Sequence, residues 1–230
     1  MTWSPRAVKA RKTLVKAVES GLTRAYSGVK LDSVAYLQYL RRAHRLPVQT
    51  AADMFHLPVE ALDHIADQTI RSSRKIAALE GAGVGMGGML TVLPDMSFLA
   101  IMSMRMLQKL SLIYGFDYAT DEEIVQLWVA AGTAAGVDLG RDLIEKEVVE
   151  RFVPRVVERV AAKMGMEIAE KWTARLIPVV SGAIGGVLNY YFIKEWGRRA
   201  KAHFRARHLA TRRLGPIRTI YEARKPLLPA

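Results

Sequence analysis

Apolar residues recur every three or four positions along almost the whole chain, and this spacing limits the folds open to it. One such stripe runs through Leu62, Ile65, Ile70, Ile76 and Leu79. That period is typical of a helix with one buried face, and short alternating strands joined by Asn-Gly or Asp-Gly turns do not occur. The sequence therefore predicts an all-α fold, a single-domain helical bundle.

Capping residues and prolines mark where the predicted helices begin and end. Thr120 and Glu123 form a capping box at the start of one helix. We expect Asp95 to cap the start of the helix that stops at Tyr114-Gly115. We expect Pro154 to break or kink a later helix. The remaining predicted boundaries are a start at Ser4-Pro5, a helix over 32–45 that ends before Leu46-Pro47, and a start at Leu57-Pro58.

Two glycine-rich stretches have almost no charge. Gly81–Met104 carries only Asp95, and the 18 residues of Leu176–Ile193 carry none. A membrane-spanning helix needs roughly 20 predominantly apolar residues, but Pro94-Asp95 divides the first stretch, and the second includes three glycines and an asparagine. We therefore expect central core helices, over 81–93 and 177–193, whose glycines let neighbouring backbones approach closely.

Positive charge is concentrated at the two ends of the chain. The net charge is +12, yet residues 1–30 hold seven Lys and Arg against one Glu, and residues 194–230 hold eleven against two. The middle is nearly neutral and apolar, so the ends favour an anionic partner, namely anionic phospholipid or nucleic acid. Nucleic acid is the less favoured of the two because no recognised reader motif accompanies the charge.

No catalytic or metal-binding motif stands out. The chain has no Cys, no His pair at ligand spacing, no P-loop and no Gly-x-Ser-x-Gly elbow. Gly83–Gly88 matches Gly-x-Gly-x-x-Gly but follows a predicted helix rather than a strand. We expect no metal and no cofactor, and the chain shows no sign of being an enzyme. The absence of a targeting peptide predicts a cytoplasmic protein.

Arg105 is the most unusual charge because it lies among apolar residues of a methionine-rich segment. One interpretation puts it on an exposed helix edge, with its stem covering apolar surface. The other makes it a buried charge awaiting an anionic head group, with Asp95 and Asp117 beside it. With Asn189, these residues form the predicted ligand-binding set.

The segment 190–209 predicts a basic amphipathic helix with an aromatic face. Such helices suit a membrane interface, where each basic residue contributes about 1 kcal/mol. A packed terminal helix with a solvated basic flank is the other interpretation. The predicted membrane-contact residues are Trp196, Arg198, Arg199, Lys201, Phe204 and Arg205.

Three segments resemble the EcsC family of bacterial proteins. They are the glycine-rich run from Glu80-Gly81 to Leu93-Pro94-Asp95, the tetrapeptide Tyr114-Gly115-Phe116-Asp117, and Ile177–Val180 with Gly185 and Asn189. Their order and spacing agree over about residues 60–205, although Ser181 stands where the family pattern has Gly. The resemblance implies a helical fold and carries over no catalytic residues. The family is named from an operon that also encodes an ABC transporter, which points to membrane-associated physiology by association only.

These observations predict basic N-terminal helices (1–46), an EcsC-like helical core (47–205) and a basic C-terminal tail (206–230). We expect a non-catalytic protein that is peripheral to the inner membrane. Its basic ends would engage anionic lipid, and its Gly- and Met-rich centre would hold acyl chains or pack against the bilayer. One alternative is an interaction module for a membrane transporter or a homo-oligomer. Another is an unrecognised hydrolase with Asp95 or Asp117 as its acid or base.

Overall fold

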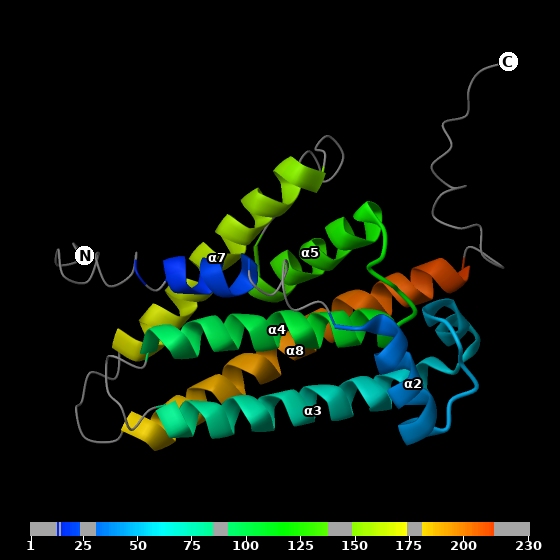
Figure 1. Cartoon of the computed structure of the whole chain (residues 1–230), viewed down its shortest axis with the longest axis horizontal. Coiled ribbons are helices and arrows are strands. Elements are labelled where there is room, and N and C mark those ends of the chain that lie inside the picture. The colour runs from blue at the N-terminus through cyan, green and yellow to red at the C-terminus, as the bar shows by residue number, and fades with distance from the viewer. Residues whose placement is uncertain are drawn as a thin grey trace, which may run out of the picture.

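The described part of the chain is helical. The computed structural model describes residues 13, 15–23, 31–84, 92–137, 149–173 and 181–213, and these contain helices and connecting turns but no strand (Figure 1). This confirms the predicted all-α fold. Besides helical residues 15–23, the elements are α2 (Ser33–His44), the 3₁₀ helix η1 (Ala51–His56), α3 (Val59–Val84), α4 (Val92–Ile113), α5 (Asp121–Ala135), α7 (Val149–Thr173) and α8 (Ser181–Arg213).

The longest helix, α8, lies at the centre of the bundle. It packs antiparallel to α3 along much of its length and also contacts α4 and α5 (Figure 1). The helices α3 and α4 form an antiparallel pair on one side, and α7 packs on α5. The ends of α3 and α7 and the starts of α4 and α8 therefore meet at one end of the molecule, and α2 and η1 lie at the other.

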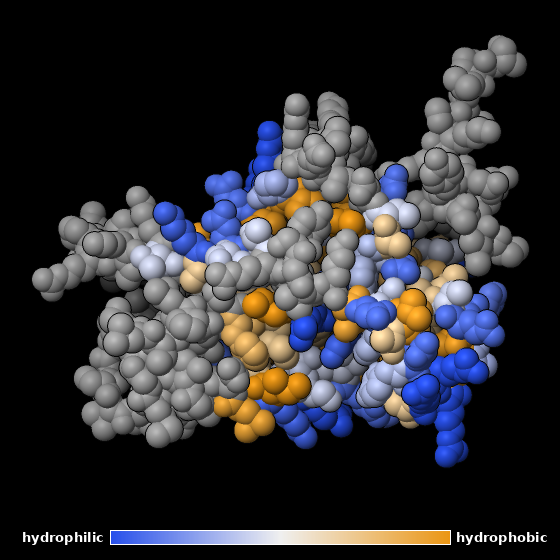
Figure 2. Space-filling model, viewed as in Figure 1, coloured by the Kyte–Doolittle hydropathy of each residue, from blue (hydrophilic) through white to orange (hydrophobic). Residues whose placement is uncertain are grey.

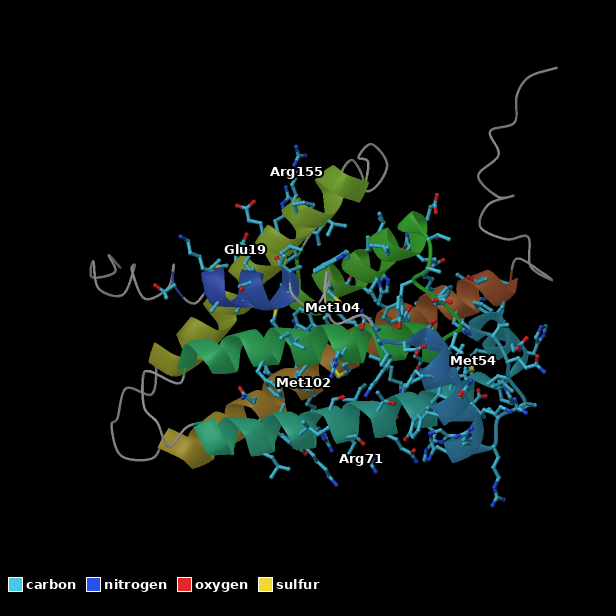
Figure 3. All side chains as sticks on the ribbon, in the orientation of Figure 1. Glu19, Met54, Arg71, Met102, Met104 and Arg155 are labelled. Atoms are coloured by element: carbon cyan, nitrogen blue, oxygen red, sulfur yellow. The ribbon has the colours of Figure 1, made fainter. Side chains whose placement is uncertain are left out.

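The core is continuous and contains side chains from all these helices. Its largest fully buried members include Trp128 of α5, Tyr114 after α4 and Phe204 of α8. Met54 of η1 and Met104 of α4 are also buried, whereas Met102 is only partly buried and lies between α4 and α3 (Figure 3). Burying apolar surface of this kind is the main favourable free-energy contribution to folding.

Several helix boundaries follow the capping signals. Asp32 caps α2, its side chain accepting from the Ala35 N–H at 3.0 Å. Thr120 caps α5 as predicted, with Oγ1 accepting from the Glu123 N–H at 3.4 Å. Gly136 ends α5 in the left-handed conformation, with φ of +69°, which glycine adopts without steric cost.

Two predicted boundaries are wrong. Asp95 does not cap α4, because the helix begins at Val92 and so takes Pro94 into its first turn. A proline is tolerated there because first-turn N–H groups have no acceptor within the helix. For α7, Pro154 is the sixth residue of a helix that continues to Thr173. It does not break the helix.

The predicted glycine-rich centre is only partly described. Residues 85–91 and 174–180 lie outside the described residues, and α3 extends to Val84. From Ser181 the chain forms one helix of 33 residues, so the predicted core helix and the basic terminal helix are a single element that passes residue 205 without interruption. No helix within the described ranges has both the length and the apolar character needed to cross a bilayer.

The close glycine contact that the structure does show was not predicted. At Gly197 a Cβ atom would lie 2.9 Å from both Cγ atoms of Ile70 and 3.0 Å from the Met106 sulfur. Such distances leave no room for a methyl group, so α8 can approach α3 this closely only with glycine at this position.

We predict that Gly197→Ala lowers the free energy of unfolding by about 1–3 kcal/mol, because the added methyl overpacks the α3–α8 contact. Urea unfolding measures the change. Ile70→Ala removes both Cγ atoms that clash, so the double variant should lose less than the sum of the single losses. Strict additivity would contradict this explanation.

Candidate functional site

The tetrapeptide Tyr114-Gly115-Phe116-Asp117 forms the corner that follows α4. Gly115 has φ of +92°, and a Cβ atom there would lie 2.8 Å from the Phe55 ring. Both the backbone conformation and the space therefore require glycine. Phe116 meets Phe55 edge-on at 5.4 Å between ring centroids, and Asp117 Oδ1 accepts from the Tyr118 N–H at 2.7 Å. This motif holds η1 against the end of α4.

Tyr114 also links the corner to α3. Its hydroxyl donates to Asp63 Oδ1 at 2.6 Å, and Arg205 Nε of α8 donates to Asp63 Oδ2 at 2.8 Å. Burial opposes ionisation of Asp63, but the bonds from Tyr114 and Arg205 and the nearby Lys201 charge outweigh it and lower the pKa of the carboxyl. Burial, followed by the bond to Asp63, raises the pKa of Tyr114. The hydroxyl therefore stays a proton donor.

His208 of α8 completes the corner. Its Nδ1 lies 2.9 Å from the Tyr114 carbonyl oxygen, and since a carbonyl can only accept, Nδ1 carries the proton. The ring stacks on Phe55 at 4.8 Å, and its buried Nε2 has no hydrogen-bond partner among the described residues. Burial is the main cause that lowers the pKa of His208. The geometry holds a neutral ring and offers it no route to solvent.

All four basic residues of α8 that were predicted to contact a membrane form ion pairs with carboxylates of the bundle. Lys201 pairs with Asp67 at 2.7 Å and Arg205 with Asp63 at 2.8 Å. Arg198 and Arg199 both pair with Glu195, at 2.6 and 3.2 Å, and the hydrogen bond from Arg198 is the main cause that lowers the pKa of Glu195 to about 2. Lys201 and Arg205 therefore hold α8 to α3, whereas the pairs with Glu195 lie within α8 itself.

Arg207, a basic residue that the sequence did not single out, follows the same pattern. Its two terminal nitrogens donate to the two Glu123 oxygens at 3.1 and 3.0 Å, and its guanidinium carbon lies 3.8 Å from the Phe116 ring centroid. One side chain therefore ties α8 to both α5 and the corner. A bidentate pair of this kind fixes orientation as well as charge.

The predicted aromatic face of α8 points into the core. Trp196 is 3% exposed and stacks on Phe192, and Phe204 is fully buried beside Phe116. Assigning Trp196 and Phe204 to membrane contact was therefore wrong for the folded bundle. The aromatic spacing that suits an interfacial helix is the same spacing that suits a packed one, so the sequence could not separate them.

Three of the four predicted ligand-binding residues are described, and they have different surroundings. Arg105 is exposed on α4, as the first of its two interpretations requires. Asp117 belongs to the corner, and Asn189 is buried in α8. The Asp95 side chain lies outside the described residues. Their ligand-binding role stays a prediction, and no cluster of metal-ligating side chains occurs within the described ranges.

A surface that the sequence analysis missed lies where α3 ends and α8 begins. Ile76, Leu79, Val187 and Tyr191 are all large apolar residues with about half or more of their area exposed, and Leu79 reaches 76%. We call these four residues the apolar end. Ile76 and Leu79 were expected in the buried stripe of α3. The helices that pack on α3 cover a face narrower than this stripe, so both side chains stay exposed. Figure 2 shows apolar surface over the adjoining parts of α3 and α4.

Four exposed cations, called the cationic rim below, lie on α3, α4 and α8. They are Arg71, Lys75, Arg105 and Lys194, and no carboxylate among the described residues pairs with them. Lys194 Nζ lies 5.8 Å from the Tyr191 ring centroid. The carboxylates of α3 that make ion pairs, Asp63 and Asp67, lie toward its opposite end. The apolar end therefore consists of exposed apolar side chains on two adjacent helices that also carry exposed cations.

We predict that Tyr114→Phe lowers the free energy of unfolding by about 1.5 kcal/mol, because Asp63 loses a hydrogen bond to its charged form. Chemical denaturation checks this. Tyr39→Phe, at an exposed tyrosine of α2, is the matched control and should leave stability unchanged. Equal stability of Tyr114→Phe and wild type would show that the corner does not depend on this bond.

Stability should fall as the pH drops below about 6.5. The pKa values of His208 and His203 are lowered in the folded state, mainly by burial, so the unfolded chain takes up protons that the folded chain does not. The contribution of these two histidines to the free energy of unfolding is complete at pH values above the ordinary histidine pKa. It is lost as the pH falls below that pKa. The pKa of Asp63 is lowered as well, so its effect on the free energy of unfolding depends on pH only below about pH 4.

Urea unfolding at pH 7.5 and pH 5.0 tests this. His208→Gln should reduce the stability difference between the two pH values. His56→Gln, at an exposed side chain, should not. An unchanged difference in His208→Gln would mean that other groups carry the acid sensitivity.

Comparison with known proteins agrees with the motifs that shape the corner. The model of the EcsC protein family matches residues 6–209. Protein EcsC of Bacillus subtilis (strain 168) is 30% identical over 160 residues, which cover 68% of each chain. No solved structure matches at a significant level. The matched region includes the whole corner and the α3–α8 pair, and the chain belongs to the EcsC family.

Proposed function

We propose that this protein is a non-catalytic, peripheral membrane protein that binds anionic lipid. The observation that carries the proposal is the apolar end, together with exposed cations that no carboxylate of the described residues pairs with. The sequence predicts lipid contact at the basic ends, at the Gly- and Met-rich centre and on the aromatic face of α8. The proposal moves the apolar contact to Ile76, Leu79, Val187 and Tyr191, because Trp196 and Phe204 are used in the core.

The composition of the connecting segments supports this orientation. Residues 85–91, which join α3 to α4, contain no charged residue, and residues 174–180, which join α7 to α8, contain only Arg175. Both connections start and finish at the same end of the bundle as the exposed apolar side chains (Figure 1). The described residues that flank both connections therefore lie at the end of the bundle that we propose to dock.

The expected energies suffice for reversible binding. Burying a large apolar side chain contributes about 1.5–3 kcal/mol, and each cation near an anionic surface adds about 1 kcal/mol. Several of each, reduced by the cost of immobilising the protein, correspond to a peripheral rather than a permanent attachment. The cationic rim predicts a preference for anionic over neutral lipid and a loss of binding at high salt. The cytoplasmic side of the inner membrane is the location we propose.

Vesicle flotation of the full chain tests the proposal. We expect wild type to float with phosphatidylglycerol-containing vesicles but not with pure phosphatidylcholine, and to lose binding at high salt. Leu79→Glu should reduce the bound fraction at least tenfold, because it places a charge in the apolar end. Val34→Glu is the matched control, since Val34 is 63% exposed on α2 at the opposite end and the substitution adds the same charge.

Two outcomes would contradict the proposal. One is equal flotation of Leu79→Glu and Val34→Glu. The other is a wild-type protein that binds neither vesicle but self-associates in light scattering, with self-association lost in Leu79→Glu. The second outcome would favour the alternative, in which the apolar end is an interface for a homo-oligomer or a membrane transporter.

A further inference from the structure

The seam between α3 and α8 changes character along its length. Toward the corner, cations of α8 face carboxylates of α3, with Lys201 on Asp67 and Arg205 on Asp63. Beyond Asp67 the described part of α3 has no further carboxylate up to Leu79, and Arg71 and Arg74 follow at helical spacing. This half of the seam carries positive charge that no side chain of the described residues neutralises.

The Arg74 side chain packs against α8 instead of extending freely into solvent. Its guanidinium carbon lies 4.7 Å from the Tyr190 ring centroid, so the group is held against α8. Its Nε atom is buried and has no hydrogen-bond partner among the described residues, while the side chain as a whole is only half-buried. An anion at the open edge of the guanidinium would not reach this Nε, so it would bind the two terminal nitrogens.

The register of α8 against α3 brings Lys194 of α8 level with Arg74 of α3. Gly197 lies against Ile70, and Tyr190 lies under Arg74, so α8 positions between 190 and 197 face α3 positions between 70 and 74. Lys194 follows Tyr190 by one turn and therefore shares its side of α8. Arg71 precedes Arg74 by three residues and projects from the edge of α3 turned away from α4 (Figure 3).

We propose that Arg71, Arg74 and Lys194 bind a phosphate monoester across the α3–α8 seam. The planar fork of arginine matches two phosphate oxygens, and the lysine ammonium adds a compact charge. The apolar end lies beside this group, with Val187 and Tyr191 one turn away from Tyr190 and Lys194 on α8. The proposal deepens the lipid-binding function and rests on it, because it names a head group with an exposed phosphate as the preferred ligand.

The test uses soluble ligands, so that it does not depend on membrane docking. Calorimetric titration of the full chain compares dihexanoyl phosphatidic acid below its micelle concentration, dihexanoyl phosphatidylcholine, and inorganic phosphate. We expect phosphatidic acid to bind at least tenfold more tightly than phosphatidylcholine. Tighter binding of phosphatidic acid than of phosphate identifies a lipid ligand, and equal binding identifies phosphate itself as the recognised group.

Arg74→Gln should weaken binding of phosphatidic acid at least tenfold, and Arg74→Lys should weaken it less because the charge remains. Arg41→Gln, at an exposed arginine of α2, is the matched control and should bind as wild type does. Lys194→Gln, at an exposed position, gives a second test if Arg74→Gln does not fold. Unchanged affinity in both Arg74→Gln and Lys194→Gln would overturn the site, as would equal binding of the two lipids.

The two proposals can fail separately. Retained binding of soluble phosphatidic acid, lost in Arg74→Gln, together with no vesicle flotation would support the phosphate site and contradict membrane docking. Flotation that depends on Leu79, together with an Arg74→Gln variant that binds soluble phosphatidic acid as wild type does, would support docking and overturn the phosphate site.

Discussion

The packing of α8 along α3 is the contact on which the rest of the bundle depends. Gly197 allows the two backbones to approach at Ile70, and two ion pairs, Lys201–Asp67 and Arg205–Asp63, fix their register on the corner side. Since α8 also touches α4 and α5, its position determines where those helices lie. A shift of α8 by one turn that took Lys201 away from Asp67 would place it opposite Arg71, a like charge.

The family's tetrapeptide secures one end of this contact. Tyr114 shares Asp63 with Arg205, and its carbonyl accepts from His208, so one residue joins α3, α8 and the end of α4. Gly115 supplies the turn that brings Phe116 against Phe55. The corner thus has a structural role, and its buried polar groups are largely paired with one another.

The two ends of the molecule differ in how their charges and apolar groups are used. At the corner, carboxylates neutralise the cations of α8 and aromatic rings fill the core. At the opposite end, Leu79 and Tyr191 are exposed and no carboxylate of the described residues pairs with Arg74, so both apolar surface and positive charge remain available. This polarity supports an orientation toward an anionic, partly apolar partner, and it is sharper than the basic termini alone would suggest.

The sequence by itself determined the helical class, the cap at Thr120 and the family, because helical periodicity, capping and a short glycine-containing motif are local properties. It could not show that Trp196 and Phe204 are buried while Leu79 is exposed, since periodicity marks a face but not what covers it. It also left open which cations are paired, because Asp63 and Arg205 lie far apart along the chain. Only the tertiary structure decided these points, since pairing and burial depend on which helix lies beside which.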